Sequence, residues 1–481
     1  MHPRLASPLR TAGAVFLGFS LASLPDVPAA GAASLAPGLN FRGGTRSDDL
    51  SSIENGAPDS MGAVGPDEVV YLVNNRYAVF RKSDGAELAS DTPRGFWSAA
   101  GVDLVDSFDP SVYYDPASGR FFAVAAQYEP VVANHLVIAV SKSSDPREGW
   151  SAFSIDPTPG LVNADFPRLG VDAEGVYVTN FTGNGTFSSY DVTVFPKADL
   201  LAATPTVANA TVFANVSPGV VGFGPVPVTK LDGGGLPTKL LGAGASYFGV
   251  VQSATLSGPV TAPSLTKGPP IVLPGLPKAP DARQPGTAPN IYQENEAAFR
   301  SGVVQRDGAI WAVHTVGSPS GRDAIEWLQL DAATNIVLQS GLIEDPALDF
   351  IFPSLAVNEH GEVVIGFTAT GEEMFPSAFA VLGETTAATT TFGTPVLLEQ
   401  GTASYEVQDN FGRGTARFGD YSATVVDPID SRTFWTFQEW VSAEDDWAVQ
   451  VTQLFVVPEP GAVLLLAGAL AGLAITGRMR A

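Results

Sequence analysis

The 481-residue chain contains no cysteine. This absence excludes disulfide bonds, thiolate catalysis, iron–sulfur clusters and cysteine-ligated zinc sites. Without covalent cross-links, the folded state must be held together by a large apolar core. The hydrophobic share of 45% is sufficient for such a core and excludes a wholly disordered chain.

Charged residues are scarce, at 16% of the chain, and they are mostly acidic. With 50 Asp and Glu against 26 Lys and Arg, the formal net charge is −24. A surface of this sign repels a phosphate backbone, which argues against a nucleic-acid partner. It suits a soluble exported protein, or one that binds calcium. The 50 Gly and 38 Pro favour many short strands and turns over long helices.

The common sequence signatures of catalysis are also missing. There is no glycine-rich phosphate loop, no H-E-x-x-H pair and no G-x-S-x-G elbow. Beyond the first residues the chain has three histidines, His135, His314 and His360, and their wide spacing argues against a multi-histidine metal site. We therefore predict no cofactor, with calcium left as the one open alternative.

The N-terminus has the features of a secretory signal peptide over residues 1–33. Arg4 and Arg10 give a basic start, and residues 12–24 form an apolar run too short to span a bilayer. Small residues follow around Ala30-Gly31-Ala32, as in an A-x-A cleavage site. The sequence therefore predicts export and removal of this segment.

The C-terminal residues 457–481 form a tail with three parts. The motif Pro458-Glu459-Pro460 is followed by an uncharged apolar stretch and then by Arg478 and Arg480. The stretch is near the lower limit for a transmembrane helix, and trailing arginines would stay on the cytoplasmic side. This tail resembles the PEP-CTERM sorting signal of Gram-negative bacteria. The resemblance implies processing by an exosortase-type protease and a membrane-anchored intermediate, followed by release to the cell surface or extracellular matrix. A plain C-terminal anchor is the alternative.

Between these ends, short strand-like runs alternate with turns in a recurring hairpin pattern. Asp109–Asp115, for example, leads through a turn into Arg120–Val124, and Phe352–Asn358 leads into Val363–Phe367. Similar hairpins recur at steps of about 50 to 70 residues, which is typical of the blades of a β-propeller. The repeats are counted from Val64, Val112, Leu169, Leu241, Val303, Leu355 and Val425.

We therefore predict an all-β body over residues 34–456, folded as a β-propeller with seven blades; six or eight blades are the neighbouring counts, and a pair of β-sandwiches is the rival architecture. Small residues in the repeat-initiating strands, such as Gly170, Ala356 and Ala423, suit strands that crowd a central channel. The Pro-rich segment 257–290 is predicted to be a surface insertion between blades.

Several segments of the body are similar to recurring segments of large secreted bacterial β-propeller proteins. These are Asp59–Pro66, Asp109–Asp115, Gln284–Thr287, Trp311–Val316 and Arg417–Ser422. The resemblance implies the fold and an extracellular setting. It implies no particular activity.

Carboxylates are the one abundant reactive class, and propeller glycosidases place acids from different blades around the channel. If the chain is a hydrolase, the candidate catalytic residues are Asp109, Asp165 and Asp420, each of which lies at the start of a hairpin. An Asp in this place can equally accept backbone N–H groups across blades, and its recurrence favours that structural role. Calcium candidates are Asp103, Asp106 and Asp109, with Asp445 and Asp446 as a second set.

Two functions follow. The first is a non-enzymatic surface or matrix protein whose body binds polysaccharide or another envelope component. The second is a glycoside hydrolase that uses channel carboxylates such as Asp109. Two acids about 5–10 Å apart at an open channel mouth would favour hydrolysis. Acids held by backbone amides would favour binding.

Overall fold

The computed structural model describes residues 33–48, 57–128, 135–156, 164–183, 188–244, 249–292, 298–386, 389–408 and 412–458. Residues 33–457 form one compact unit. Residues 1–32 of the predicted signal peptide and nearly all of the predicted sorting tail, including Glu459, Pro460, Arg478 and Arg480, lie outside the described residues. Among the described helices, none has both the length and the apolar character that a membrane crossing requires.

The described strands form six sheets, and the first three are antiparallel with four strands each. The first contains β2 (Met61–Val64), β3 (Glu68–Val73), β4 (Arg76–Arg81) and β5 (Glu87–Asp91). The second contains β6 (Asp106–Asp115), β7 (Arg120–Tyr128), β8 (His135–Ser141) and β9 (Trp150–Ile155). The third contains β10 (Ala164–Val171), β11 (Gly175–Gly183), β12 (Ser188–Pro196) and β13 (Thr211–Val216).

The fourth sheet has eight strands and consists of two antiparallel groups of four. One group is β14 (Phe223–Lys230), β15 (Thr238–Ala243), β16 (Val250–Ser257) and β17 (Ser264–Val272). The other is β18 (Val303–Arg306), β19 (Ala309–Gly317), β20 (Asp323–Asp331) and β21 (Val337–Ile343). The two groups join only through parallel pairing of their first strands, β14 and β18.

The fifth sheet contains β22 (Asp349–Val357), β23 (Glu362–Gly371), β24 (Met374–Thr386), β25 (Thr389–Phe392) and β26 (Val396–Glu399). The sixth contains β27 (Ala423–Val426), β28 (Thr433–Ala443), β29 (Asp446–Val457) and β1 (Ser34–Thr45). The described helices are short: α1 (Pro93–Ala100), α2 (Lys197–Leu200), α3 (Pro218–Val221) and the 3-10 turns η1 (Arg46–Asp48) and η2 (Pro146–Glu148).

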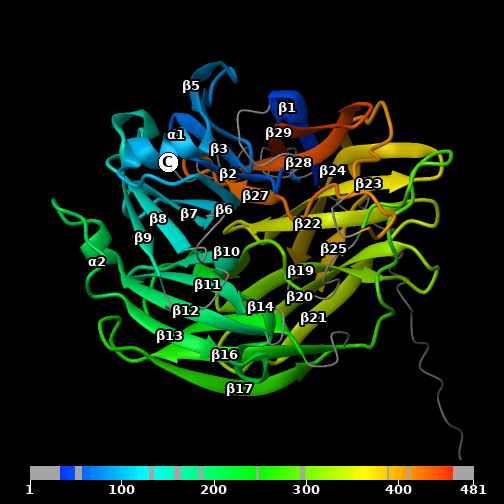
Figure 1. The fold of residues 1–481 in the computed structure, drawn as a ribbon. Coiled ribbons are helices and arrows are strands. Elements are labelled where there is room, and N and C mark those ends of the chain that lie inside the picture. Colours follow the sequence, from blue (N-terminus) through cyan, green and yellow to red (C-terminus); the bar gives the residue numbers. More distant parts are fainter. Residues whose placement is uncertain are drawn as a thin grey trace, which may run out of the picture. The chain divides into compact units, whose positions relative to one another are not determined.

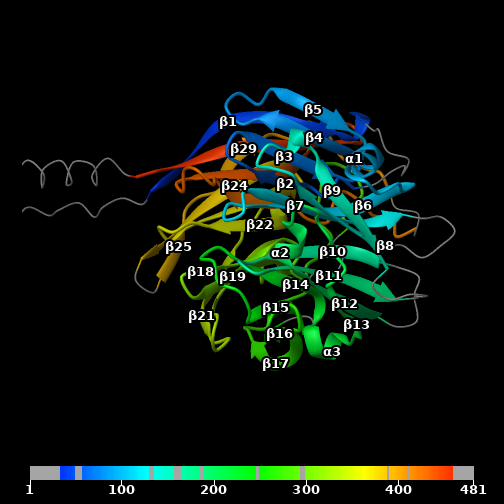
Figure 2. The same ribbon diagram turned by 90° about the vertical axis from the view of Figure 1, so that its left-hand side faces the viewer.

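The sheets are arranged in a ring (Figure 1). The first strands of successive groups contact one another in the order β2, β6, β10, β14, β18, β22, β27 and back to β2. The ring is closed by the two ends of the body, because β1 pairs antiparallel with β29, beside which it lies in both ribbon views (Figure 2). In this closed arrangement each sheet lies between two neighbours, while the outermost described strand of each group keeps one unpaired side. The prediction of an all-β, propeller-like body is confirmed.

Apolar side chains between neighbouring sheets hold the ring together. Phe122 and Ile138 of the second sheet, for example, pack in one buried cluster with Leu169 and Val178 of the third. A single sheet could not cover both of its own apolar faces, so each sheet is stable only between its neighbours.

Two sequence predictions need correction. Leu241 was expected in a repeat-initiating strand, but it lies in β15, the second strand of its group. The first strand of that group is β14, which contacts the first strands of the two neighbouring groups. The predicted insertion 257–290 is wrong for Ser264–Val272, which forms β17 and pairs with β16. The prolines of β17 are tolerated because it is the last strand of its group, where one side needs no backbone hydrogen bonds.

The close approach of the first strands explains one of the predicted small residues. A Cβ on Gly170 would lie 2.7 Å from the carbonyl oxygen of Pro227, in the backbone of β14. We expect Gly170→Ala to lower the free energy of unfolding by about 1–3 kcal/mol, because a backbone neighbour cannot move aside cheaply. Gly302→Ala is the matched control, since open space surrounds its Cβ position. Equal melting temperatures for the two variants would contradict the packing of β10 against β14.

Candidate functional site at the start of the inner strands

The strands that face the channel share a backbone feature near their first residues. Asp59, Asp109, Phe166 and Phe352 have φ values of 50°, 52°, 53° and 51°, in the left-handed region that non-glycine residues rarely adopt. Strand pairing shifts register at this point in β6, β10 and β22. A bulge of this kind changes the direction in which the side chain of the bulged residue points, and strained residues of this type cluster at functional sites. We call this end of the ring the channel mouth.

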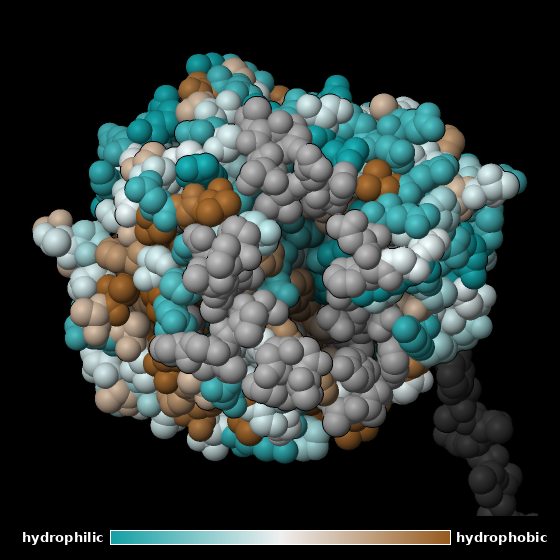
Figure 3. Space-filling model, in the orientation of Figure 1, coloured by the Kyte–Doolittle hydropathy of each residue, from teal (hydrophilic) through white to brown (hydrophobic). Residues whose placement is uncertain are grey.

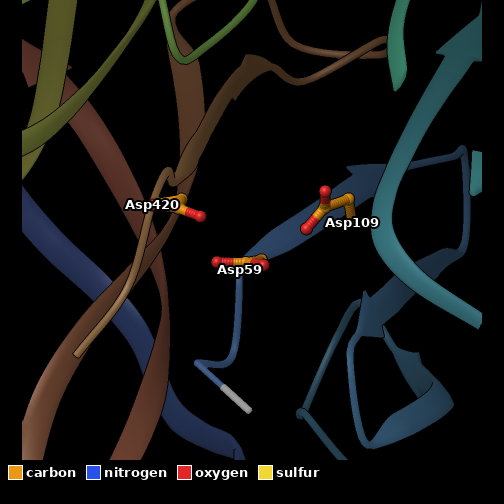
Figure 4. Close-up of side chains that lie close together, drawn as sticks. All are labelled: Asp59, Asp109 and Asp420. Atoms are coloured by element: carbon orange, nitrogen blue, oxygen red, sulfur yellow. The ribbon is translucent and has the colours of Figure 1, made fainter. Parts of the chain in front are cut away.

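Three carboxylates from distant parts of the chain meet at the channel mouth. Asp59, Asp109 and Asp420 point toward one another from separate segments (Figure 4). Each offers an oxygen, and these oxygens all lie within 4.8 Å of one another. All three side chains are buried, with exposed fractions of 2%, 8% and 5%. Such crowding of like charges requires protons or nearby cations.

Asp109 and Asp59 are held in place by hydrogen bonds to the backbone and to the side-chain amide of Asn74. Asp109 accepts a hydrogen bond from the Phe166 N–H across the neighbouring sheet, at 3.0 Å. Its own N–H donates to Asn74 Oδ1 at 2.8 Å, and Asn74 Nδ2 donates to Asp59 Oδ2 at 2.7 Å. Asp109 thus makes the contact with a neighbouring sheet that is expected of an Asp in a structural role.

Asp59 is the member of the cluster that holds a proton most tightly. Burial, followed by the charges of Asp420 and Asp109, raises its pKa well above the usual value for an aspartate. Oxygens of Asp59 and Asp109 lie within 4.8 Å of each other, and this proximity acts in the same direction as burial. Carboxyl groups this close are more stable when one of them is protonated, and the raised pKa favours the proton on Asp59.

Asp420 is stabilised in its charged form. Burial by itself would raise its pKa, but Arg417 and Arg300 outweigh burial, so the pKa is lowered. Arg300 Nη1 lies 2.7 Å from Asp420 Oδ1, and Arg417 Nη1 donates to the same oxygen at 2.9 Å. Arg417 Nη2 donates to the other oxygen, which makes this pair bidentate.

The surrounding charges bear on whether the three acids would take a metal ion. Their oxygens are close enough to share one cation. However, Asp420 already has two guanidinium partners, and Arg168 is a third arginine whose charge acts on the cluster. A divalent cation would be repelled by these arginines, so the residues fit a proton on Asp59 better than calcium.

Arg168 has the most unusual environment in the site. It is 2% exposed, and none of its three guanidinium nitrogens has a hydrogen-bond partner among the described residues. The guanidinium carbon lies 3.4 Å from the ring centroid of Phe166 and 4.0 Å from that of Tyr421. Burial lowers the pKa of Arg168 from its usual value. The two rings reduce the cost of burying this charge but accept no conventional hydrogen bond.

The structure brings together some of the predicted site residues and not others. Asp109 and Asp420 belong to the cluster, whereas Asp165 is half-buried and is not a member. Of the calcium candidates, Asp103 accepts a hydrogen bond from the Ser98 hydroxyl, and Asp106 accepts one from the Ser107 N–H. Neither belongs to the cluster.

The second set of calcium candidates is likewise engaged elsewhere. Asp445 and Asp446 accept the backbone N–H groups of Glu406 and Ser47. Neither is part of a group of three acids among the described residues.

Sequence reasoning missed Asp59 and Arg168. Asp59 precedes Gly65-Pro66 by six residues, as Asp109 precedes Asp115-Pro116, so aligning the strand starts could have found it. For Arg168 the sequence offers no such signal, because its neighbour Tyr421 is more than 250 residues away.

Further along the same strands the channel encloses a cavity of about 510 Å³. Side chains from β2, β6, β10, β22 and β27 line it, among them Met61, Val112, Leu169, Leu355 and Val425. In the space-filling view the ring is hollowed at its centre (Figure 3). The channel thus combines a charged mouth with a more apolar interior.

No protein-family model matches the chain, and no curated protein matches it. Solved structures similar to it include a sialidase from Trypanosoma rangeli, with 11% identity over 90% of this chain and a TM-score of 0.37. The chain spans 62% of that sialidase. An α-L-arabinanase from Penicillium chrysogenum has 10% identity over 87% of this chain and 98% of its own, with a TM-score of 0.37. An α-L-arabinofuranosidase from Fusarium graminearum has 10% identity, coverages of 83% and 93%, and a TM-score of 0.37.

Proposed function

We propose that this chain is an exported surface or matrix protein whose propeller-like body binds polysaccharide or another envelope component at the channel mouth. The basic, apolar and small-residue order of residues 1–33 supports export. The resemblance of residues 457–481 to a PEP-CTERM tail supports transient anchoring and processing. Together they would place the body outside the cytoplasm.

The proposal includes seven blades. Seven groups of four or five strands, which begin with β2, β6, β10, β14, β18, β22 and β27, support this count. The eight-stranded sheet contributes two blades, because only its first strands pair across the junction. In this description β1 is the outermost strand of the last blade.

The observation that carries the binding role is the way in which the mouth carboxylates are held. Asp109 is bound by a backbone N–H, and Asp420 is bound by two guanidinium groups. Groups held in this way are preorganised to shape and charge a recognition site. They have little freedom to exchange protons with a substrate.

A glycan array with the purified chain, run beside a hydrolysis assay on the same glycans, tests this proposal. Retention of one glycan class without release of reducing ends is the expected result, with and without a calcium chelator. Release of reducing ends from a bound glycan would replace binding with catalysis. Absence of retention across the array would leave the polysaccharide proposal without support.

One observation favours hydrolysis as a second candidate function. Asp59, whose raised pKa favours its protonated form, lies beside a second carboxyl group, that of Asp109, and glycosidases also use a protonated carboxyl together with a second one. The oxygens of the two groups lie within 4.8 Å of each other, however, and a retaining glycosidase separates its two carboxyls by roughly 5–5.5 Å. If the hydrolysis assay is positive, Asp109→Asn should abolish turnover while glycan retention and the melting temperature stay nearly unchanged.

The sorting tail makes a separate prediction. Replacing Glu459 by alanine removes the only charge between the body and the apolar stretch, within the motif that a processing protease would read. In cells that process the natural chain, we expect the variant to accumulate as a longer, membrane-associated form. Immunoblots of membrane and released fractions measure this, with Glu444→Ala as the control. Release of the variant at the normal length would contradict recognition of this motif.

A further inference from the structure

The unpartnered guanidinium of Arg168 is difficult to explain as a structural element. A guanidinium presents five N–H donors, and a buried donor without an acceptor destabilises the folded state, more so when it is charged. The other two arginines of the mouth do not share this problem, because Arg300 and Arg417 both pair with Asp420. A buried charge without an acceptor would be costly to keep unless it had a partner other than the residues that the structure describes.

The local charges indicate the sign and size of that partner. At the mouth, Arg300 and Arg417 both pair with Asp420. The guanidinium of Arg168 has no such partner among the described residues, so it presents one unbalanced positive charge. A single carboxylate would balance this charge, whereas a phosphate dianion would exceed it.

The geometry agrees with a carboxylate. A guanidinium is planar, and the parallel N–H bonds along its edge match the two oxygens of a carboxylate. The rings of Phe166 and Tyr421 lie against the Arg168 guanidinium and help to fix its orientation. Arg300, whose guanidinium carbon lies 5.1 Å from the Phe166 centroid, adds a second cation beside it.

We propose that Arg168 anchors a subsite for the carboxylate of an acidic sugar, with Arg300 beside it. This inference rests on the proposed glycan-binding function and narrows it to uronate-containing polysaccharide. The neutral part of the sugar would lie toward the channel. Recognition of a uronate would thus come from a local positive charge within a chain whose net charge is strongly negative.

Calorimetric titration and thermal melting of the full chain with D-galacturonate and D-glucuronate test the inference, with D-galactose, D-glucose and inorganic phosphate as matched probes. We expect at least one uronate to bind ten or more times more tightly than its neutral counterpart and more tightly than phosphate. Equal binding of the uronates and the neutral sugars, or tighter binding of phosphate, would overturn the carboxylate assignment.

Variants of Arg168 test whether this residue binds the uronate. Arg168→Met removes a buried, unpartnered charge, so it should melt no lower than the natural chain without ligand, yet lose at least tenfold in uronate affinity. Arg168→Lys keeps the positive charge but lacks the two parallel N–H donors of a guanidinium, so it should also bind the uronate less tightly. This variant carries the test if Arg168→Met fails to fold. Arg81→Met is the control, because Arg81 is half exposed and pairs with Asp84 on the surface.

The outcomes separate this inference from the function on which it rests. If an array glycan binds equally well to the natural chain and to Arg168→Met, the carboxylate subsite is wrong and glycan binding stands. If neither uronates nor any array glycan bind, both proposals fail. Undiminished uronate binding by Arg168→Met and Arg168→Lys would place the anion elsewhere.

Discussion

Replacing Asp420 by asparagine should lower the free energy of unfolding by about 3–5 kcal/mol. The substitution keeps the shape of the side chain but removes a buried charge that faces both Arg300 and Arg417. These guanidinium groups would then remain at the mouth with too little negative charge to balance them. The cost comes from burying two cations that have lost a counter-charge more than from the net value of the ion pairs themselves.

Chemical denaturation of Asp420→Asn measures this effect, and Asp84→Asn supplies a matched control. Asp84 also pairs with an arginine three residues away, but both side chains are about half exposed. Solvent screens that pair, so its loss should shift the midpoint of unfolding far less. Similar midpoints for the two variants would show that the mouth cluster is solvated and not a buried charge network.

Asp59→Asn should make the protein more stable at neutral and alkaline pH. The folded-state pKa of Asp59 is raised, so the folded protein binds its proton more tightly than the unfolded chain does. The contribution of Asp59 to the free energy of unfolding is therefore fully present below the unfolded pKa of about 3.9, and it is lost as the pH rises toward the folded pKa. Each unit of pKa elevation corresponds to about 1.4 kcal/mol lost across that window. Asparagine removes this loss because it has no proton to release.

The measurement is the free energy of unfolding between pH 4 and pH 9 for the natural chain and for Asp59→Asn. Glu439 also has a pKa raised well above its usual value, chiefly by burial, so a residual slope of the same sign should remain in the variant. The double variant Asp59→Asn, Glu439→Gln should be flatter still. A profile for Asp59→Asn as steep as that of the natural chain would mean that Asp59 is ionised in the folded state.

Recurring hairpins made the ring predictable from the sequence. The alternation of apolar residues and the turns at Gly85, Gly119 and Gly361, all of which have positive φ, are local signals that survive in the fold. The misplaced repeat start at Leu241 has a local cause as well. The true first strand, β14, contains Pro225 and Pro227, and a strand with two prolines does not resemble a central one.

The site was only partly predictable, because its chemistry depends on distances between strands. Asp109 and Asp420 could be proposed from their positions at hairpin starts, but nothing local shows that they meet Asp59. The state of each acid is set by groups far away in sequence, such as Arg300 for Asp420 and Phe166 for Asp109. Arg168 becomes noticeable only when the surrounding strands leave its donors without acceptors.

The most direct test of this account is an experimental structure of the chain with a bound uronate. The account predicts density for the sugar at the channel mouth, with both carboxylate oxygens within hydrogen-bonding distance of the Arg168 guanidinium and with Asp109 still bound to the Phe166 N–H. A sugar held only by groups outside the mouth, with Arg168 paired to a protein acceptor, would contradict it.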